Sequence, residues 1–305
     1  MSGSLSFIFW RAPKTVLRVT GEDAFTFLQG QFTNELRQPP GSSTYGLWLN
    51  QKGRVTADSV VLRLEENEFL LLSANTGVAV LRHRLEDYIV ADDVVLHDET
   101  EGACGLVIGG VDCTAAVGAV FGVVPAPGHF VRRGEAVIYR GRRLASEHYE
   151  VFGPAGSLTP AREQLEQRGL IAIGVDEMER RRIADRIPAV PQDLGPVDLP
   201  NEGGLDGSAI SFTKGCYLGQ EVMARLKNLG QVRRRLEVVC GKGPPPEAGT
   251  ALYQGLKKSG EVRSVVRVAD GFVAFAMLSL INQNPEAGFS LTPDGVPAIW
   301  IGSHE

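Results

Sequence analysis

The chain has 305 residues, of which 43% are hydrophobic and 22% are charged, and its net charge is −5 at pH 7. This length predicts two or three domains. The negative charge argues against direct nucleic-acid binding, which needs a basic surface, although Arg180, Arg181 and Arg182 form a local basic patch. No apolar run approaches the roughly 18 residues of a membrane span, and the cluster at 7–10 is too short for a signal peptide. We therefore expect a cytoplasmic protein without a membrane partner.

The N-terminal third predicts an antiparallel sheet covered by two helices. The expected strands lie at 15–20, 45–49, 54–64, 69–73 and 94–98. Gly21-Glu22-Asp23 opens the first helix with acidic residues in its first turn. Thr76 caps a second helix over about 77–88, whose apolar residues share one face. Helices packed on an antiparallel sheet indicate an α+β unit.

A second unit with a similar element order follows, and the C-terminal part has a different pattern. The second unit is expected to hold strands at 104–109, 136–139 and 149–152 and helices at 112–121 and 160–168. A charged helix over 175–186 stops before Pro188, and the Pro/Gly-rich segment 188–206 crosses back to the first unit. Short strands between Gly/Pro turns, at 233–240, 250–253, 260–268, 273–278 and 298–301, predict a small β-barrel.

The stretch FTKGCYLGQEVMAR, residues 212–225, carries the most unusual local chemistry. The apolar spacing of its second half predicts a helix from Gly219, so Cys216 lies just ahead of a helix N-terminus. The helix dipole, together with positive charge on Lys214 and Arg225, lowers a thiol pKa from its ordinary value of about 8.5. The alternative is a cysteine buried in a tight strand-to-helix turn, and the local chemistry leaves both open.

The string KGCYLGQE at 214–221, followed by Arg225 and Gly230, resembles the signature of the YgfZ family, which is related to the aminomethyltransferase (T-protein) of glycine cleavage. TGEDAFTFLQGQFTNEL at 20–36 and GLWLNQKGRVTAD at 46–58 resemble further segments of that family. The resemblance implies a GcvT-like ring of two ferredoxin-like α+β domains and a β-barrel around a central channel. The expected domains are 1–100 with 180–230, then 101–179, then 231–305, and Cys216 would face the channel from the first.

The resemblance implies a tetrahydrofolate-dependent helper in assembly or repair of iron–sulfur clusters and, through those enzymes, in tRNA modification. Its partners would be a folate-type molecule and iron–sulfur proteins or assembly factors. Cys216 would be the functional thiol, as a redox thiol, a transient cluster ligand or a methyl or thiol acceptor. Lys214 would be the second catalytic residue, as a partner of the thiolate or an anion site. The other motif residues are Gly215, Tyr217, Gly219, Gln220, Glu221 and Arg225. Arg225 either pairs with Glu221 one turn away or faces a carboxylate such as a folate tail.

Two further residues are expected at a folate site. Asn75 follows a strand end where T-proteins carry a pterin-binding asparagine, although Asn-Thr-Gly also suits a turn. Asp58 lies where T-proteins carry two adjacent aspartates, but the pair here is Ala57-Asp58. Ala184 replaces the glutamate that contacts the pterin in T-proteins. These departures predict weakened, altered or absent tetrahydrofolate binding and no glycine-cleavage activity.

No metal centre is expected. The four cysteines and five histidines show neither a C-x-x-C pair nor metal-ligand spacing. Because a cluster needs several ligands, Cys216 alone would need a partner protein, glutathione or a second copy. Two alternatives stand beside this function: a folate-dependent one-carbon transferase or demethylase, and a non-catalytic scaffold that has lost folate.

Overall fold

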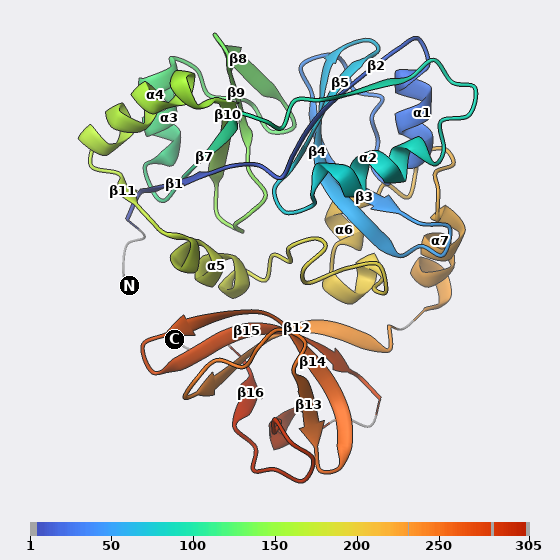
Figure 1. Cartoon of the computed structure of the whole chain (residues 1–305), viewed down its shortest axis with the longest axis vertical. Helices are drawn as coiled ribbons and strands as arrows, with labels where there is room; N and C mark the ends of the chain where they lie inside the picture. The colour runs from blue at the N-terminus through green and yellow to red at the C-terminus, as the bar shows by residue number, and fades with distance from the viewer. Residues whose placement is uncertain (1–4, 231, 282–283, 303–305) are drawn as a thin grey trace.

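The computed structural model describes residues 5–230, 232–281 and 284–302. Within these ranges the strands form three sheets, of five, six and five strands. Figure 1 shows two of them side by side in the upper half of the molecule and the third below, with helices α5 and α6 in between. None of the described helices is both long enough and apolar enough to span a membrane.

The first sheet is antiparallel, has the strand order β3-β4-β5-β2-β6, and carries two helices on one face. Its elements are β2 (Thr15–Thr20), α1 (Ala24–Gln31), β3 (Ser43–Leu49), β4 (Val55–Glu65), β5 (Glu68–Ser73), α2 (Val78–Glu86) and β6 (Val95–Asp98). Burial alternates along most of β4, because one face of the strand packs under the helices. The expected elements of this unit are present, with ends shifted by a few residues.

The second sheet has the order β11-β1-β7-β10-β9-β8. Its elements are β1 (Phe7–Arg11), β7 (Ala103–Gly109), α3 (Cys113–Phe121), β8 (Phe130–Arg133), β9 (Ala136–Arg140), β10 (His148–Pro154), α4 (Ala155–Gln167) and β11 (Ile171–Ala172). The sequence did not predict β1, β8 or β11. Helix α4 begins at Ala155 rather than at Pro160, which lies inside the helix at an exposed position.

Strand β1 links the N-terminus to the second sheet. It pairs antiparallel with β7 over its whole length, although the expected boundaries assigned residues 1–100 to the first unit. Phe7 and Phe9 pack against Met178 of α5, whereas Ile8 enters the core below α3 and α4. Because both faces of β1 are covered, its sequence shows no alternation that would identify a strand.

The connecting segment holds helices α5 (Val175–Ala184), η1 (Pro200–Gly203), α6 (Asp206–Ala209) and α7 (Gln220–Leu229). Arg182 of α5 is 1% exposed and pairs with Asp193 at 2.7 Å, and Asp193 also accepts the backbone N–H of Ser264 in the third sheet. This pair joins α5, the crossing segment and the C-terminal part. The patch Arg180 to Arg182 is therefore engaged within the protein, with Glu177 and Glu179 as its other acidic partners.

The C-terminal part is a curled, half-barrel antiparallel sheet of order β13-β14-β15-β12-β16. Its elements are β12 (Arg234–Lys242), β13 (Ala251–Gln254), β14 (Lys257–Val268), β15 (Gly271–Ser279), η2 (Pro285–Ala287) and β16 (Ile299–Ile301). One apolar cluster joins this sheet to the first, with Leu47 and Val55 on one side and Phe275 and Met277 on the other. Shared cores of this kind fix the three parts relative to one another.

Candidate functional site

Cys216 lies exposed in a loop that is anchored on both sides. The loop spans 213–218, between the short helix α6 and helix α7. Lys214 and Tyr217 are buried, with 6% exposure each, and Cys216 stands between them in solvent. The thiol is therefore presented at a fixed place on the surface, and the alternative of a buried packing cysteine is wrong.

Lys214 caps helix α1 rather than serving the thiol. Its Nζ donates to the backbone carbonyls of Gln29, Phe32 and Asn34, at 2.8, 2.6 and 2.9 Å. An ammonium group has three N–H donors, and all three are used here. Burial lowers the pKa of Lys214 to about 8. Lys214 thus positions the Cys216 loop, with no donor left over for the sulfur.

Tyr217 and Gly219 complete the anchor. The Tyr217 ring lies in the shared apolar cluster, and burial raises its pKa to about 12. Gly219 is the N-cap of α7 with φ +84°, and a Cβ there would come 2.9 Å from the carbonyl oxygen of Asn50. Only glycine meets both conditions without strain. The expected tight turn before a helix is present for this reason.

The remaining motif residues lie on the outer side of the loop. Gln220 begins α7, and Glu221 pairs with Arg225 at 2.9 Å, with both side chains mostly exposed. Of the two roles that the sequence allowed for Arg225, the structure shows the ion pair with Glu221 one helical turn away. Arg225 does not line the cavity described next, and neither does any other residue of 213–230.

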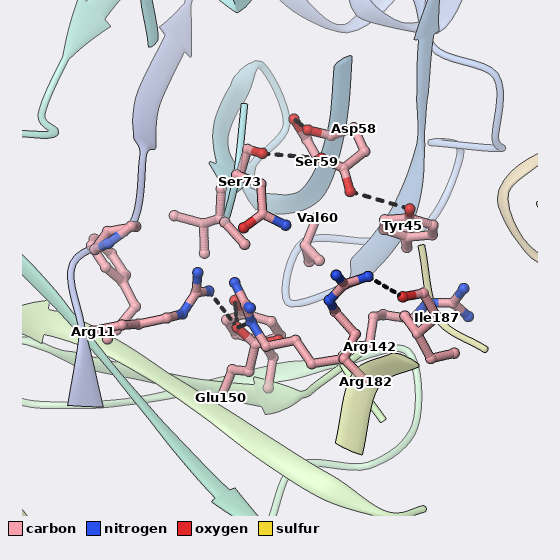
Figure 2. Close-up of a pocket in the computed structure, with 18 of the residues that line it drawn as sticks. Arg11, Tyr45, Asp58, Ser59, Val60, Ser73, Arg142, Glu150, Arg182 and Ile187 are labelled. Carbon is pink, nitrogen blue, oxygen red and sulfur yellow. Dashed lines mark hydrogen bonds and ion pairs between the residues drawn. The ribbon is translucent and has the colours of Figure 1, made fainter. Parts of the chain in front are cut away.

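A cavity of about 70 Å³ lies between the first and second sheets. Strands β3, β4 and β5 form one wall, and β7, β9 and β10 form the other. Figure 2 shows Asp58, Tyr45 and Ser73 on one side and Arg11 with Glu150 on the opposite side. Asp58 and Asn75 both line this cavity, so the structure brings together the two residues expected at a folate site and separates them from Cys216.

Asp58 is held by hydroxyl groups. Its carboxylate accepts from Ser73 Oγ at 3.0 Å and from Tyr45 Oη at 3.2 Å. Burial raises its pKa against the opposing effect of these donors. Asp58 is therefore committed to a local hydrogen-bond network, and position 57, a buried alanine, supplies no second carboxylate.

The opposite side of the cavity was not predicted from the sequence. Glu150 accepts from Arg11 Nη2 at 2.8 Å and lies 3.8 Å from Arg143 Nε. Burial alone would raise the pKa of Glu150, but Arg11 and Arg143 hold it at about 2. Arg142 stacks over the Tyr45 ring, 4.4 Å from its centroid, and donates to Ser208 Oγ. No local signal marks these residues, because they come from separate strands and loops.

Ala184 is not among the residues that line the cavity, but Arg182 of the same helix is. Asp185, its acidic neighbour, instead accepts the backbone N–H of Ala145 at 2.9 Å. In the residues that the structure describes, no group of three or more His, Cys, Asp or Glu side chains is arranged to hold a metal ion.

These features define a GcvT-type protein, and the chain belongs to the family of the GCVT N-terminal domain, whose model matches residues 14–214. The fold is that of the glycine cleavage system aminomethyltransferase T from Bartonella henselae, with a TM-score of 0.81 over 98% of this chain and 86% of that chain, at 18% identity. The family match ends at Lys214, just before the exposed cysteine.

Among curated proteins, the chain is similar to the mitochondrial iron-sulfur cluster assembly factor IBA57. The mouse protein is 29% identical over 87% of this chain and 75% of its own length, and the human protein is 28% identical over the same shares. The tRNA-modifying protein YgfZ of Edwardsiella ictaluri is 28% identical over 84% of this chain and 79% of its own length. The predicted resemblance to YgfZ proteins is confirmed.

Proposed function

We propose that this chain is a YgfZ-type accessory factor for iron–sulfur cluster assembly or repair, and that Cys216 supplies one transient ligand to the cluster during transfer. The observation that carries this proposal is the exposed thiol between the two buried anchors Lys214 and Tyr217. The names of the mouse, human and bacterial relatives support the process. A role in tRNA modification would follow through client iron–sulfur enzymes.

The transfer step is a ligand exchange at iron. The Cys216 thiol loses its proton and bonds to an iron of the cluster, while a thiolate of glutathione or of the donor protein leaves that iron and takes up a proton. No electron is transferred in this exchange. Clusters need several thiolate ligands, and in the described part of the chain no group of three or more His, Cys, Asp or Glu side chains is arranged to hold a metal ion. The other ligands therefore come from the partner.

The test compares Cys216→Ser with Cys240→Ser, a matched control in the C-terminal sheet. Each variant is expressed in cells lacking the protein, and the activity of a [4Fe–4S] enzyme such as aconitase is measured with its protein level. We expect Cys216→Ser to behave like the deletion and Cys240→Ser like the wild type. Full activity with Cys216→Ser would refute the role of the thiol.

The cavity is small for tetrahydrofolate, the cofactor that the resemblance implies. An apolar cavity of about 150 Å³ takes one benzene molecule, and a bicyclic pterin is larger, whereas this cavity measures about 70 Å³. Both of its carboxylates are already engaged, Asp58 by hydroxyls and Glu150 by Arg11. The proposed cluster transfer therefore does not involve folate. A folate-dependent one-carbon transferase is the less supported alternative.

The scaffold alternative predicts that partner binding and enzyme activity are insensitive to Cys216→Ser, so the same experiment tests it. The compartment stays a prediction: the sequence favours the cytoplasm, whereas the mouse and human relatives are named as mitochondrial proteins.

A further inference from the structure

The cavity between the first and second sheets carries more positive than negative charge. Four guanidinium groups line it, from Arg11, Arg142, Arg143 and Arg182, against the carboxyl groups of Asp58 and Glu150. Arg182 is neutralised by Asp193 and Glu179, which do not line the cavity. Three arginines from β1 and the β9–β10 loop therefore face two carboxyl groups.

The two carboxyl groups do not balance these three arginines. Glu150 forms its short ion pair with Arg11, and Arg143 Nε is 3.8 Å away from it, beyond hydrogen-bond distance. Asp58 lies on the opposite wall, where hydroxyl donors hold it and burial favours its neutral form. Arg143 therefore shares the Glu150 carboxylate with Arg11 and makes no hydrogen bond to it.

The arginines also carry buried N–H donors that lack an acceptor. Arg143 is 8% exposed, and its Nε and Nη2 are buried without a hydrogen-bond partner. The Nε atoms of Arg11 and Arg142 are likewise buried and unpaired. Four donor atoms on three side chains that line the cavity therefore have no acceptor within the protein, whereas buried donors are nearly always satisfied in folded proteins.

The loop that carries two of these arginines is held in place by a buried histidine. His148 Nε2 accepts the backbone N–H of Arg143 at 3.0 Å, while its Nδ1 donates to the carbonyl of Ser146. A Cβ on Gly141 would lie 2.2 Å from His148 Nε2. Residues 141–148 therefore form a fixed loop, which places the Arg142 and Arg143 guanidinium groups before any ligand arrives.

We propose that this cavity binds a compact oxyanion, such as inorganic phosphate or a short carboxylate, with Arg143 as its principal ligand and Arg11 and Arg142 as supporting donors. A guanidinium group presents parallel N–H donors that match two oxygens of such an anion. The volume agrees, since about 70 Å³ is less than half of the roughly 150 Å³ of a cavity that takes one benzene molecule. Burial and the neighbouring Arg11 lower the pKa of Arg143 to about 10, an effect that a bound anion opposes.

This site is independent of the proposed role of Cys216, which does not line the cavity. The probe is inorganic phosphate, titrated by calorimetry into the wild-type protein and into Arg143→Gln, Arg143→Lys, Arg82→Gln and Cys216→Ser, with sodium chloride at matched ionic strength as the blank. Arg82 is an exposed arginine paired with Glu86 on α2 and serves as the matched control. Acetate and tetrahydrofolate are titrated in parallel.

We expect saturable phosphate binding to the wild type, Arg82→Gln and Cys216→Ser. Arg143→Gln should weaken it at least about tenfold, and Arg143→Lys, which keeps the charge but loses the fork, should weaken it about fivefold. Arg143→Lys keeps the test decisive if the glutamine variant does not fold. Equal binding to the wild type and both Arg143 variants, a response that only follows ionic strength, or tetrahydrofolate displacing phosphate from the wild type would each overturn the proposal.

Discussion

Replacing Lys214 by methionine tests whether the Cys216 loop is anchored as described. Methionine keeps most of the length and apolar character of the stem but removes the ammonium group. The carbonyls of Gln29, Phe32 and Asn34 would then lose their shared donor. The C-terminal end of α1 would keep the bond from the backbone N–H of Leu218 to the carbonyl of Gly30, at 3.0 Å, and the bond from the N–H of Phe32 to the carbonyl of Leu28, at 2.9 Å.

The size of the effect follows from these contacts. A hydrogen bond from a charged donor contributes about 1.5–3 kcal/mol, and Lys214 makes three. Desolvation of the ammonium, which lowers its pKa to about 8, offsets part of that gain. We therefore expect Lys214→Met to lower the free energy of unfolding by about 3–5 kcal/mol, a range comparable to the loss of one partner from a buried ion pair.

Urea unfolding followed by circular dichroism measures this change, with Lys52→Met in the exposed β3–β4 turn as the control. Hydrogen exchange at the Leu218 amide gives a local readout and should accelerate in Lys214→Met. A variant within about 1 kcal/mol of the wild type, with the Leu218 amide still protected, would refute the view that Lys214 holds the loop.

Three further predictions concern the frame around the two sites. Asp193→Ala leaves Arg182 without its most buried partner and should cost about 3–5 kcal/mol, whereas the exposed pair broken by Arg180→Gln should cost under about 1 kcal/mol in the same urea experiment. Gly219→Ala should cost about 1–3 kcal/mol more than Gly128→Ala, since both glycines have positive φ but only Gly219 has close neighbours; equal losses would contradict this reading. For Glu150, a pKa lowered from 4.5 to about 2 corresponds to about 3 kcal/mol at about 1.4 kcal/mol per unit. This contribution of Glu150 to the unfolding free energy is complete above about pH 4.5 and is lost as the pH falls towards about 2. Glu150→Gln should therefore flatten the acid side of a plot of unfolding free energy against pH. An unchanged acid side would show that other groups cause acid unfolding.

The sequence by itself determined the elements with a clear period and the local character of the cysteine motif. The strands and helices of residues 15–98 followed from alternation and helical spacing, because these signals are carried by neighbouring residues. The expected caps were wrong, since Gly77 rather than Thr76 is the N-cap of α2 and no acidic residue lies in the first turn of α1. The turn before α7 was equally local, since Gly219 needs a conformation that only glycine adopts freely. Strand β1 was not predicted, because both its faces are buried and its sequence therefore lacks the alternation of polar and apolar residues that marks a strand.

Only the tertiary structure decided what the charged residues do. The sequence predicted that Lys214 supplies positive charge beside the Cys216 thiol. Its hydrogen-bond acceptors instead lie 180 or more positions earlier in the chain. Arg11 and Glu150 are 139 positions apart and meet because β1 and β10 both pair with β7. A charged side chain pairs with whichever group the fold brings within a few ångströms. No sequence pattern around either residue predicts its partner.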